Sequence, residues 1–208
     1  MPAVPAATRV YGKVAAEERR ASRRGILLEA ALDLIAESGV RSVTKRAVCS
    51  RAQLNDRYFY EQFSDVDALL VALGDWVTTQ GLAAVLDATR GAAPSARVHA
   101  AADATLSFVL ADPRRAQLLL GSHTNEALQR IRLSTNHQIA TAMSTLTHEL
   151  LGPAAPPQND TDLVSFTLVS GTLELVAAWL RGEFDTDRDH LTSIIAAMLL
   201  AAGRISRI

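Results

Sequence analysis

Residues 44–63, TKRAVCSRAQLNDRYFYEQF, decide the fold of the N-terminal part of this chain. Thr44 and Asn55 are favourable N-terminal caps, and each precedes a segment long enough for only one or two helical turns. The tight connection Ala52-Gln53-Leu54 joins the two segments. Two short helices joined in this way form a helix-turn-helix, whose second helix can enter the major groove of DNA. A generic two-helix hairpin would give a similar pattern, so geometry alone leaves both interpretations open.

Helical periodicity continues on both sides of this stretch, and no segment shows the alternation of a strand. Upstream, apolar residues at helical spacing predict a helix over 16–38, with Gly39 as its left-handed stop. Downstream, Ser64-x-x-Asp67 is a capping box ahead of a helix that reaches about Thr89. A second capping box, Thr186-x-x-Asp189, precedes the last helix. Further helices are predicted over 98–112, 113–121, 125–151, 160–181 and 187–202. The predicted fold class is therefore all-α.

The composition is that of one large or two small globular domains, because 49% of the 208 residues are apolar and 21% are charged. Cys49 is the single cysteine, which indicates a reducing compartment and a packing role. The longest apolar run, Ile194 to Ala202, is nine residues, short of the roughly 20 that a membrane span needs. We therefore expect a cytoplasmic protein with no membrane partner.

Charge is distributed unevenly along the chain. Residues 1–60 hold eleven Lys and Arg against six Asp and Glu, a net charge of +5. Residues 61–208 hold ten against sixteen, a net charge of −6. A basic head on an acidic body is the distribution expected of a polyanion-binding protein, although basic heads also occur without nucleic acid.

The helix-turn-helix stretch resembles the tetracycline-repressor (TetR) family of bacterial transcriptional regulators. The positions that carry the resemblance are Gly39, Thr44, Val48-Cys49, Ala52-Gln53-Leu54-Asn55, Phe59-Tyr60, Phe63, Val66 and Leu69. Looser similarity continues at 112–116 and 171–180, so nearly the whole chain is covered. The resemblance implies an N-terminal three-helix helix-turn-helix domain and a C-terminal helical bundle for ligand binding and dimerisation. We expect a flexible arm over 1–15, the DNA-binding domain over 16–63 and the bundle over 64–208.

The sequence departs from the family's pattern at two positions. Gln53 stands where the family usually has a turn glycine, so either it adopts a left-handed conformation at a cost of roughly 1 kcal/mol or the turn bends slightly differently. Val66 stands where a lysine commonly contacts phosphate, so we expect that contact to be absent.

The resemblance places the DNA contacts in the helix-turn-helix and on the helix before it. Arg57 can pair with a guanine and is the predicted base reader. Asp56 either accepts from a cytosine amine or orients Arg57, and we favour orientation. Arg46 and Tyr60 are predicted to contact phosphate. The full set of predicted DNA-binding residues is Arg23, Thr44, Lys45, Arg46, Asn55, Asp56, Arg57, Tyr58 and Tyr60.

The same resemblance implies an effector pocket and a dimer interface in the C-terminal bundle. The predicted pocket residues are Trp76, Phe108, Leu119, His123, His137, Phe166 and Ser170. The predicted interface residues are Gly171, Ala178, Trp179, Ile195 and Leu199. Residues 95–151 carry only nine charged side chains in 57, which favours a mainly apolar effector over an anionic metabolite.

We therefore expect a ligand-responsive, DNA-binding transcriptional repressor that binds a palindromic double-stranded operator as a homodimer and is released by a small apolar effector. The alternative is an all-α small-molecule carrier or protein-interaction module without specific DNA binding. The chain contains no His-Glu-x-x-His, phosphate-binding glycine loop or serine elbow, so we expect no enzyme activity and no cofactor. His137 and His148 would lie about 16 Å apart on a helix, too far to share a metal.

Overall fold

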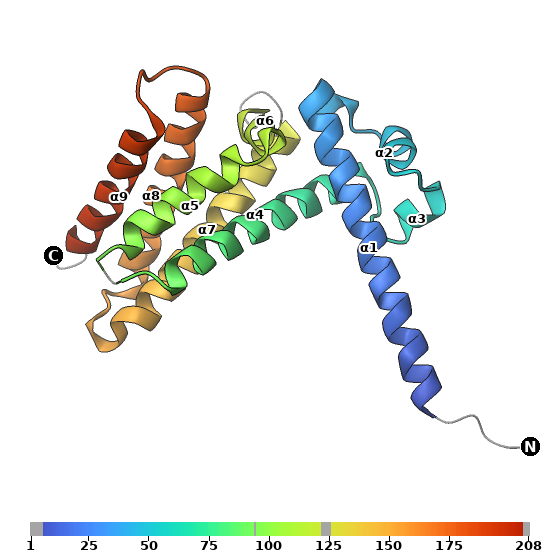
Figure 1. Ribbon diagram of the computed structural model, residues 1–208, viewed down its shortest axis with the longest axis horizontal. Helices are drawn as coiled ribbons and strands as arrows, with labels where there is room; N and C mark the ends of the chain where they lie inside the picture. Colours follow the sequence, from blue (N-terminus) through green and yellow to red (C-terminus); the bar gives the residue numbers. More distant parts are fainter. Residues whose placement is uncertain (1–5, 94, 122–125, 206–208) are drawn as a thin grey trace, which may run out of the picture. The chain divides into compact units, whose positions relative to one another are not determined.

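The computed structural model describes residues 6–93, 95–121 and 126–205, and within these ranges every regular element is helical (Figure 1). The predicted all-α class is confirmed. The helices are α1 (Ala6–Ser38), α2 (Lys45–Ala52), α3 (Asp56–Tyr60), α4 (Val66–Arg90), α5 (Arg97–Leu110), α6 (Pro113–Gly121), α7 (Glu126–Leu151), α8 (Gln158–Leu180) and α9 (Arg188–Ile205). Short 3-10 turns follow α1 at Val40–Ser42 and α7 at Gly152–Ala154.

The chain divides into two compact units, an N-terminal unit over Met1–Leu73 and a C-terminal unit over Gly74–Ile208. The boundary falls inside α4, ten residues beyond the predicted boundary at 63/64. The first turns of α4 belong to the N-terminal unit, where Leu69 and Leu73 are fully buried. These two leucines therefore complete the small core of the three-helix domain, which a boundary before α4 would leave open.

Helix α1 begins earlier than the sequence predicts. The expected arm over 1–15 is helical from Ala6 onward, and residues 1–5 lie outside the described ranges. The sequence has no proline between Pro5 and Pro94, so no residue type in this stretch forbids the helix. The predicted start of α1 is too late because the apolar periodicity of residues 16–38 does not extend to the part of the helix before them.

Two helices begin one residue later than their predicted capping boxes. In α4 the Oδ1 atom of Asp65 accepts the backbone N–H of Ala68 at 2.8 Å. In α9 the Oδ1 atom of Asp187 accepts the backbone N–H of His190 at 2.7 Å. The bond from Ala68, together with one from the Ser64 hydroxyl, lowers the pKa of Asp65. An aspartate next to the predicted Ser or Thr therefore takes the cap position in both cases.

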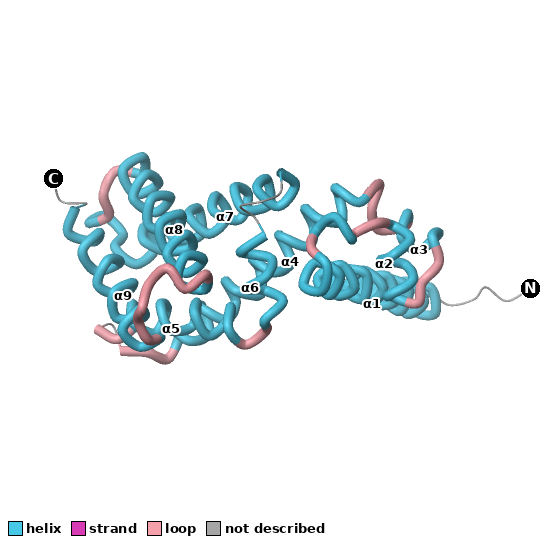
Figure 2. The backbone as a smooth tube through the Cα atoms, turned by 90° about the horizontal axis from the view of Figure 1, so that it is seen from above, coloured by secondary structure: helices cyan, strands magenta, loops and turns pink. Residues whose placement is uncertain are grey.

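The C-terminal unit is a helical bundle in which α5 packs against α9 and α7 packs against α8 (Figure 2). One buried cluster joins α5, α8 and α9, and its members are Ala102, Leu106, Val176, Leu191, Ile195 and Ala196. Between α7 and α8 the amide of Asn136 donates to the hydroxyl of Ser170 at 3.0 Å. Helix α4 approaches α7 so closely that a Cβ atom at Gly74 would overlap the side chain of Ile131. Glycine is therefore required at this crossing.

By length and composition alone, α4 and α8 could cross a membrane. A core helix of a globular protein passes the same test, and both helices supply walls of the apolar cavity described below. The cavity and the core account for part of their apolar character, and Val71, Leu86 and Leu163 remain exposed.

Candidate DNA-reading head and ligand cavity

The two helices of the helix-turn-helix begin at the residues that the sequence predicts. Thr44 Oγ1 accepts the backbone N–H of Ala47 at 3.2 Å, and Asn55 Oδ1 accepts that of Tyr58 at 3.3 Å. Both side chains satisfy free N–H groups of the first helical turn. Thr44 and Asn55 therefore fix where α2 and α3 start.

The turn between α2 and α3 contains a left-handed residue that is not glycine. Gln53 has φ 53° and ψ 37°, and its N–H is directed at the Ser50 carbonyl at 3.3 Å. The next N–H, of Leu54, donates to the Cys49 carbonyl at 3.0 Å. These bonds close the C-terminus of α2 and hold the turn in place. The structure thus places Gln53 in the strained conformation that the sequence comparison with the family anticipates.

We expect Gln53→Gly to stabilise the N-terminal unit by about 1 kcal/mol, because glycine adopts the left-handed conformation without a Cβ clash. The measurement is urea unfolding followed by circular dichroism. Ser50→Gly is the matched control, since Ser50 is an exposed position inside α2 where glycine is unfavourable. Equal effects of the two glycines on the free energy of unfolding would contradict strain at the turn.

The core of the N-terminal unit, called the head from here on, is aromatic and contains the single cysteine. Phe59 is fully buried, and its ring centroid lies 5.7 Å from that of Phe63. Val48 and Cys49 pack in the same core from α2. Burial raises the pKa of the Cys49 thiol, which keeps it protonated and agrees with the predicted packing role.

The two cations at the start of α2 are in different states. Arg46 is exposed and forms no hydrogen bond or ion pair with any residue that the structure describes. The Nζ atom of Lys45 forms an ion pair with Asp56 and lies 5.1 Å from the centroid of the Tyr60 ring. The hydrogen bond to Asp56 raises the pKa of Lys45, which therefore stays protonated near neutral pH. Asp56 thus pairs with Lys45 and does not orient Arg57, which corrects the sequence-based prediction.

Glu61 is the residue that orients Arg57, and the sequence analysis missed it. The side chain of Arg57 is 83% exposed, and its Nε donates to Glu61 Oε1 at 3.0 Å. From α1, Arg23 lies 3.8 Å from the other carboxylate oxygen and 4.7 Å above the Tyr58 ring. Arg20 donates to the backbone carbonyl of Glu61 at 2.9 Å. The i,i+4 spacing of Arg57 and Glu61 on a helix is the signal that could have found this pair.

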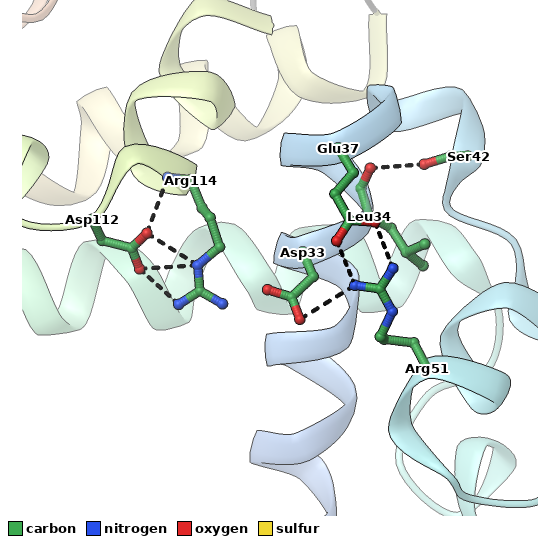
Figure 3. A network of polar contacts seen from close by, with 7 residues as sticks. All are labelled: Asp33, Leu34, Glu37, Ser42, Arg51, Asp112 and Arg114. Carbon is green, nitrogen blue, oxygen red and sulfur yellow. Dashed lines mark hydrogen bonds and ion pairs between the residues drawn. The ribbon is translucent and has the colours of Figure 1, made fainter.

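A second set of ion pairs fastens α2 to α1 (Figure 3). Arg51 donates to Glu37 at 2.8 Å and lies 3.6 Å from Asp33, both on α1. Figure 3 also draws a separate pair within the C-terminal unit, in which Arg114 donates to Asp112. Arg51 is held by two carboxylates, so it fastens α2 to α1 within the head. Arg46 is therefore the cation of α2 that is directed outward.

The C-terminal unit encloses a cavity of about 570 Å³. Its walls come from α4, α5, α6, α7, α8 and α9, and most of the lining residues are apolar. Three charged residues stand among the described lining residues: Arg115, Arg132 and Glu149. A Cβ atom at Gly81 would come within 3.1 Å of the Phe108 ring, so the glycine lets that ring lie against α4. The volume is in the range of small-molecule sites.

Residues 27–73 match the family described as bacterial regulatory proteins of the tetR family. This stretch runs from Leu27 in the buried part of α1 to Leu73, the last buried leucine of the N-terminal unit. Residues 27–73 are therefore a DNA-binding domain of the TetR family.

Solved structures with the same fold extend the similarity over most of the chain. FadR from Bacillus subtilis, solved in complex with stearoyl-CoA, is 17% identical with a TM-score of 0.66, covering 85% of this chain and 97% of that one. FadR from Bacillus halodurans is 18% identical with a TM-score of 0.67, covering 86% and 94%. A transcriptional regulator from Rhodococcus sp. Rha1 is 23% identical with a TM-score of 0.59, covering 86% and 96%. No curated protein sequence matches the chain significantly. The protein is a DNA-binding transcriptional regulator that carries a TetR-family DNA-binding domain.

The predicted pocket residues of this TetR-family protein are only partly brought together. Phe108 and Leu119 line the cavity, and His123 lies outside the described residues. The other four predicted residues, Trp76, His137, Phe166 and Ser170, do not line it.

The reason for this correction is helical register. The cavity wall on α7 includes Thr135 and Ile139, and His137 points to a different face, where its ring centroid lies 4.8 Å from that of Phe166. Ser170 is likewise turned toward Asn136. The prediction did not include Arg115 or Arg132 among the cavity residues. The spacing of apolar residues along α7 could have suggested Arg132, but it gives no information about Arg115.

The predicted dimer residues are also corrected. Ile195 and Ala178 are 1% and 6% exposed within a single subunit, so they belong to its own core. Leu199 lines the cavity, and Trp179 packs on the core cluster while its Nε1 donates to a backbone carbonyl. Of the predicted set, only Gly171 is classed as exposed. Both faces of α9 are apolar, and the sequence pattern did not show which one faces inward.

Proposed function

We propose that this TetR-family protein is a homodimeric repressor that binds a palindromic operator and is released when a small, mainly apolar effector fills its cavity. The observation that carries the proposal is the head: α3 presents Arg57 outward, and α2 presents Arg46, which forms no ion pair with any residue that the structure describes. A base-reading cation next to a phosphate-contacting cation is the contact pattern of a helix-turn-helix on DNA.

Dimerisation is supported by exposed apolar side chains on α9 and α8. Ile194, Met198 and Leu200 are 42%, 39% and 57% exposed, and Leu163 on α8 is 61% exposed. Gly171 lies on the exposed side of α8 and would let a partner helix approach closely. An interface between helix pairs of this kind would bury the apolar side chains that a single subunit leaves in water.

The cavity supports an effector of low polarity, since its wall is mainly apolar and its volume suits a small molecule. The stearoyl-CoA complex of FadR from Bacillus subtilis supports ligand binding by a protein of this fold. Preferential binding of the effector to a conformation that cannot engage the operator would lower the affinity for DNA.

Footprinting on the DNA upstream of the protein's own coding region, combined with sedimentation of the free protein, tests this function. We expect a protected site with dyad symmetry and a dimer at micromolar concentration. A carrier or protein-interaction module would show no footprint, and its binding to a random duplex would lack the steep salt dependence of phosphate contacts. A footprint without dyad symmetry would contradict the dimeric mode of binding.

We expect Arg57→Ala and Arg46→Ala to have different effects on DNA binding. Loss of Arg57 should cost roughly 1–3 kcal/mol on the operator and relax the base preference at one position of each half-site. Loss of Arg46 should weaken binding to all sequences alike and reduce the salt dependence. Titrations of operator and scrambled duplexes at several salt concentrations measure both effects. Arg90→Ala, an exposed change in the C-terminal unit, is the control, and equal loss of selectivity in both head variants would remove Arg57 from base reading.

A further inference from the structure

Arg57 uses only one nitrogen of its guanidinium within the part of the chain that the structure describes. Its Nε donates to Glu61 Oε1 at 3.0 Å, and the side chain is otherwise 83% exposed. A guanidinium can hold a pair of acceptors with Nε and one terminal nitrogen, or with its two terminal nitrogens. Because Glu61 occupies Nε, only the pair of terminal nitrogens is left for DNA.

Glu61 is itself held in place by α1. Arg20 donates to the backbone carbonyl of Glu61 at 2.9 Å, and Arg23 lies 3.8 Å from its Oε2 atom. The N–H of Glu61 donates to the Arg57 carbonyl at 3.0 Å and closes the end of α3. An isolated exposed ion pair at i,i+4 spacing fixes its side chains only weakly. The contacts from α1 and α3 therefore make Glu61 a firmer anchor for Arg57 than such a pair.

The two terminal nitrogens of Arg57 match the acceptors of a guanine. In the major groove guanine presents O6 and N7 as neighbouring acceptors, whereas adenine presents one acceptor and one donor. An arginine that donates to both guanine atoms discriminates against every other base. A guanidinium that is already oriented loses less conformational freedom when it forms this contact. The anchor at Nε thus favours guanine at the position that Arg57 reads.

The same carboxylate makes a phosphate an unfavourable partner for Arg57. A phosphate paired with Arg57 would bring its negative charge close to the Glu61 carboxylate, which lies 3.0 Å from Nε. Like charges at such short range repel, and an uncharged guanine avoids this cost. Arg46 has no ion pair with a described carboxylate, so its contact with phosphate carries no such penalty.

We propose that Glu61 is a specificity-determining residue that positions Arg57. It leaves the terminal nitrogens of Arg57 for guanine and disfavours a contact of Arg57 with the DNA backbone. Glu61 acts through Arg57 and contacts no base itself. The inference rests on the proposed base reading by Arg57 and gives the physical origin of its preference. Loss of Glu61 therefore lowers specificity in two ways, by loosening the base contact and by strengthening sequence-independent binding.

Three substitutions at Glu61 separate these two effects. Glu61→Met removes both the acceptor and the charge. Glu61→Gln keeps an acceptor without the charge, and Glu61→Asp keeps the charge on a side chain that is one methylene shorter. Selection of bound sequences from a library of randomised duplexes measures the base preference of the full chain. Titration of a scrambled duplex at several salt concentrations measures its sequence-independent binding.

Glu61→Met should lower the preference for guanine about tenfold at the position that Arg57 reads. It should also tighten binding to the scrambled duplex about two- to fivefold and steepen the salt dependence. Glu61→Gln should keep part of the base preference and bind the scrambled duplex more tightly. Glu61→Asp should lower the base preference and leave scrambled binding unchanged. Weaker binding to both kinds of duplex, with the base preference intact, would indicate a purely structural residue and overturn the proposal.

Two further variants test whether Glu61 acts through Arg57. Glu18→Met is the matched control, because it removes an exposed carboxylate of α1 and should leave the base preference unchanged. In a protein that already carries Arg57→Ala, Glu61→Met should cause no additional loss of base preference. An additional loss there would make Glu61 a base reader in its own right and contradict the proposal. Glu61→Gln and Glu61→Asp keep the test decisive if Glu61→Met fails to fold, which circular dichroism shows.

Arg57→Ala separates failure of this inference from failure of the proposed function. If Arg57→Ala leaves the selected sequences unchanged, base reading by Arg57 fails and the role of Glu61 fails with it. If Arg57→Ala relaxes one position and none of the Glu61 variants does, base reading holds and only the positioning role of Glu61 fails.

Discussion

Phe59→Ala is expected to abolish DNA binding by unfolding the N-terminal unit. The Phe59 side chain is fully buried and packs with Phe63, so its truncation leaves a cavity that the short helices cannot close. Such changes cost about 3–5 kcal/mol, a large share of the 5–15 kcal/mol that stabilises a typical domain. In thermal unfolding of the full chain, we expect the transition of the N-terminal unit to move to much lower temperature while that of the C-terminal unit persists.

Tyr60→Ala is the matched comparison, because the two aromatic rings are neighbours in sequence and differ in burial. The Tyr60 side chain is 59% exposed, and its removal should weaken DNA binding without a comparable loss of stability. Circular dichroism and binding to a duplex separate the two variants. A folded Phe59→Ala protein with unchanged DNA affinity would contradict the assignment of Phe59 to the core of the head.

Ile195→Ala is expected to destabilise the C-terminal unit by about 2–5 kcal/mol at every protein concentration. Ile195 is 1% exposed and belongs to the cluster that joins α5, α8 and α9. Its neighbour Ile194 is 42% exposed, so Ile194→Ala should change the stability of a subunit by no more than about 0.5 kcal/mol. Under the proposed dimer, Ile194→Ala should instead weaken association.

Urea unfolding and sedimentation at several concentrations measure these two effects separately. If the Ile195→Ala variant is less stable only at low protein concentration, Ile195 belongs to the subunit interface and not to the core of one subunit. The pair also tests the orientation of α9, because adjacent residues of a helix point in directions about 100° apart.

The head could be predicted from the sequence because its signals are local. The caps Thr44 and Asn55 act within three residues, and both are used as predicted. The same local rule placed two other caps one residue early, since an aspartate follows the predicted Ser or Thr in each case. At Asp65 and Asp187 the neighbouring side chains compete for one role, and the sequence alone does not decide between them.

The candidate cavity and the dimer surface depend on which helix face turns inward, and the sequence carries less information about that. Helices α8 and α9 are apolar around most of their circumference, so Ile194 and Ile195 look equivalent until α5 is placed against one of them. Periodicity identifies a helix with one polar face well and a helix with two apolar faces poorly. The contacts of Glu61 with Arg20 and Arg23 could not be predicted for a related reason, since these partners are far away in the sequence, whereas its pairing with Arg57 follows from i,i+4 spacing.

The internal ion pairs of the head have a consequence for how the protein exchanges ions on DNA. Arg57 and Lys45 are already neutralised by Glu61 and Asp56, so a phosphate that takes over either cation displaces a carboxylate of the protein. A carboxylate displaced in this way attracts a solution cation, so Arg57 and Lys45 add less to the net release of ions than Arg46, which forms no ion pair with any residue that the structure describes. The logarithmic salt dependence of binding should therefore be shallower than the number of basic residues in the head suggests, and the affinity should persist at ionic strengths that dissociate a protein with unpaired cations.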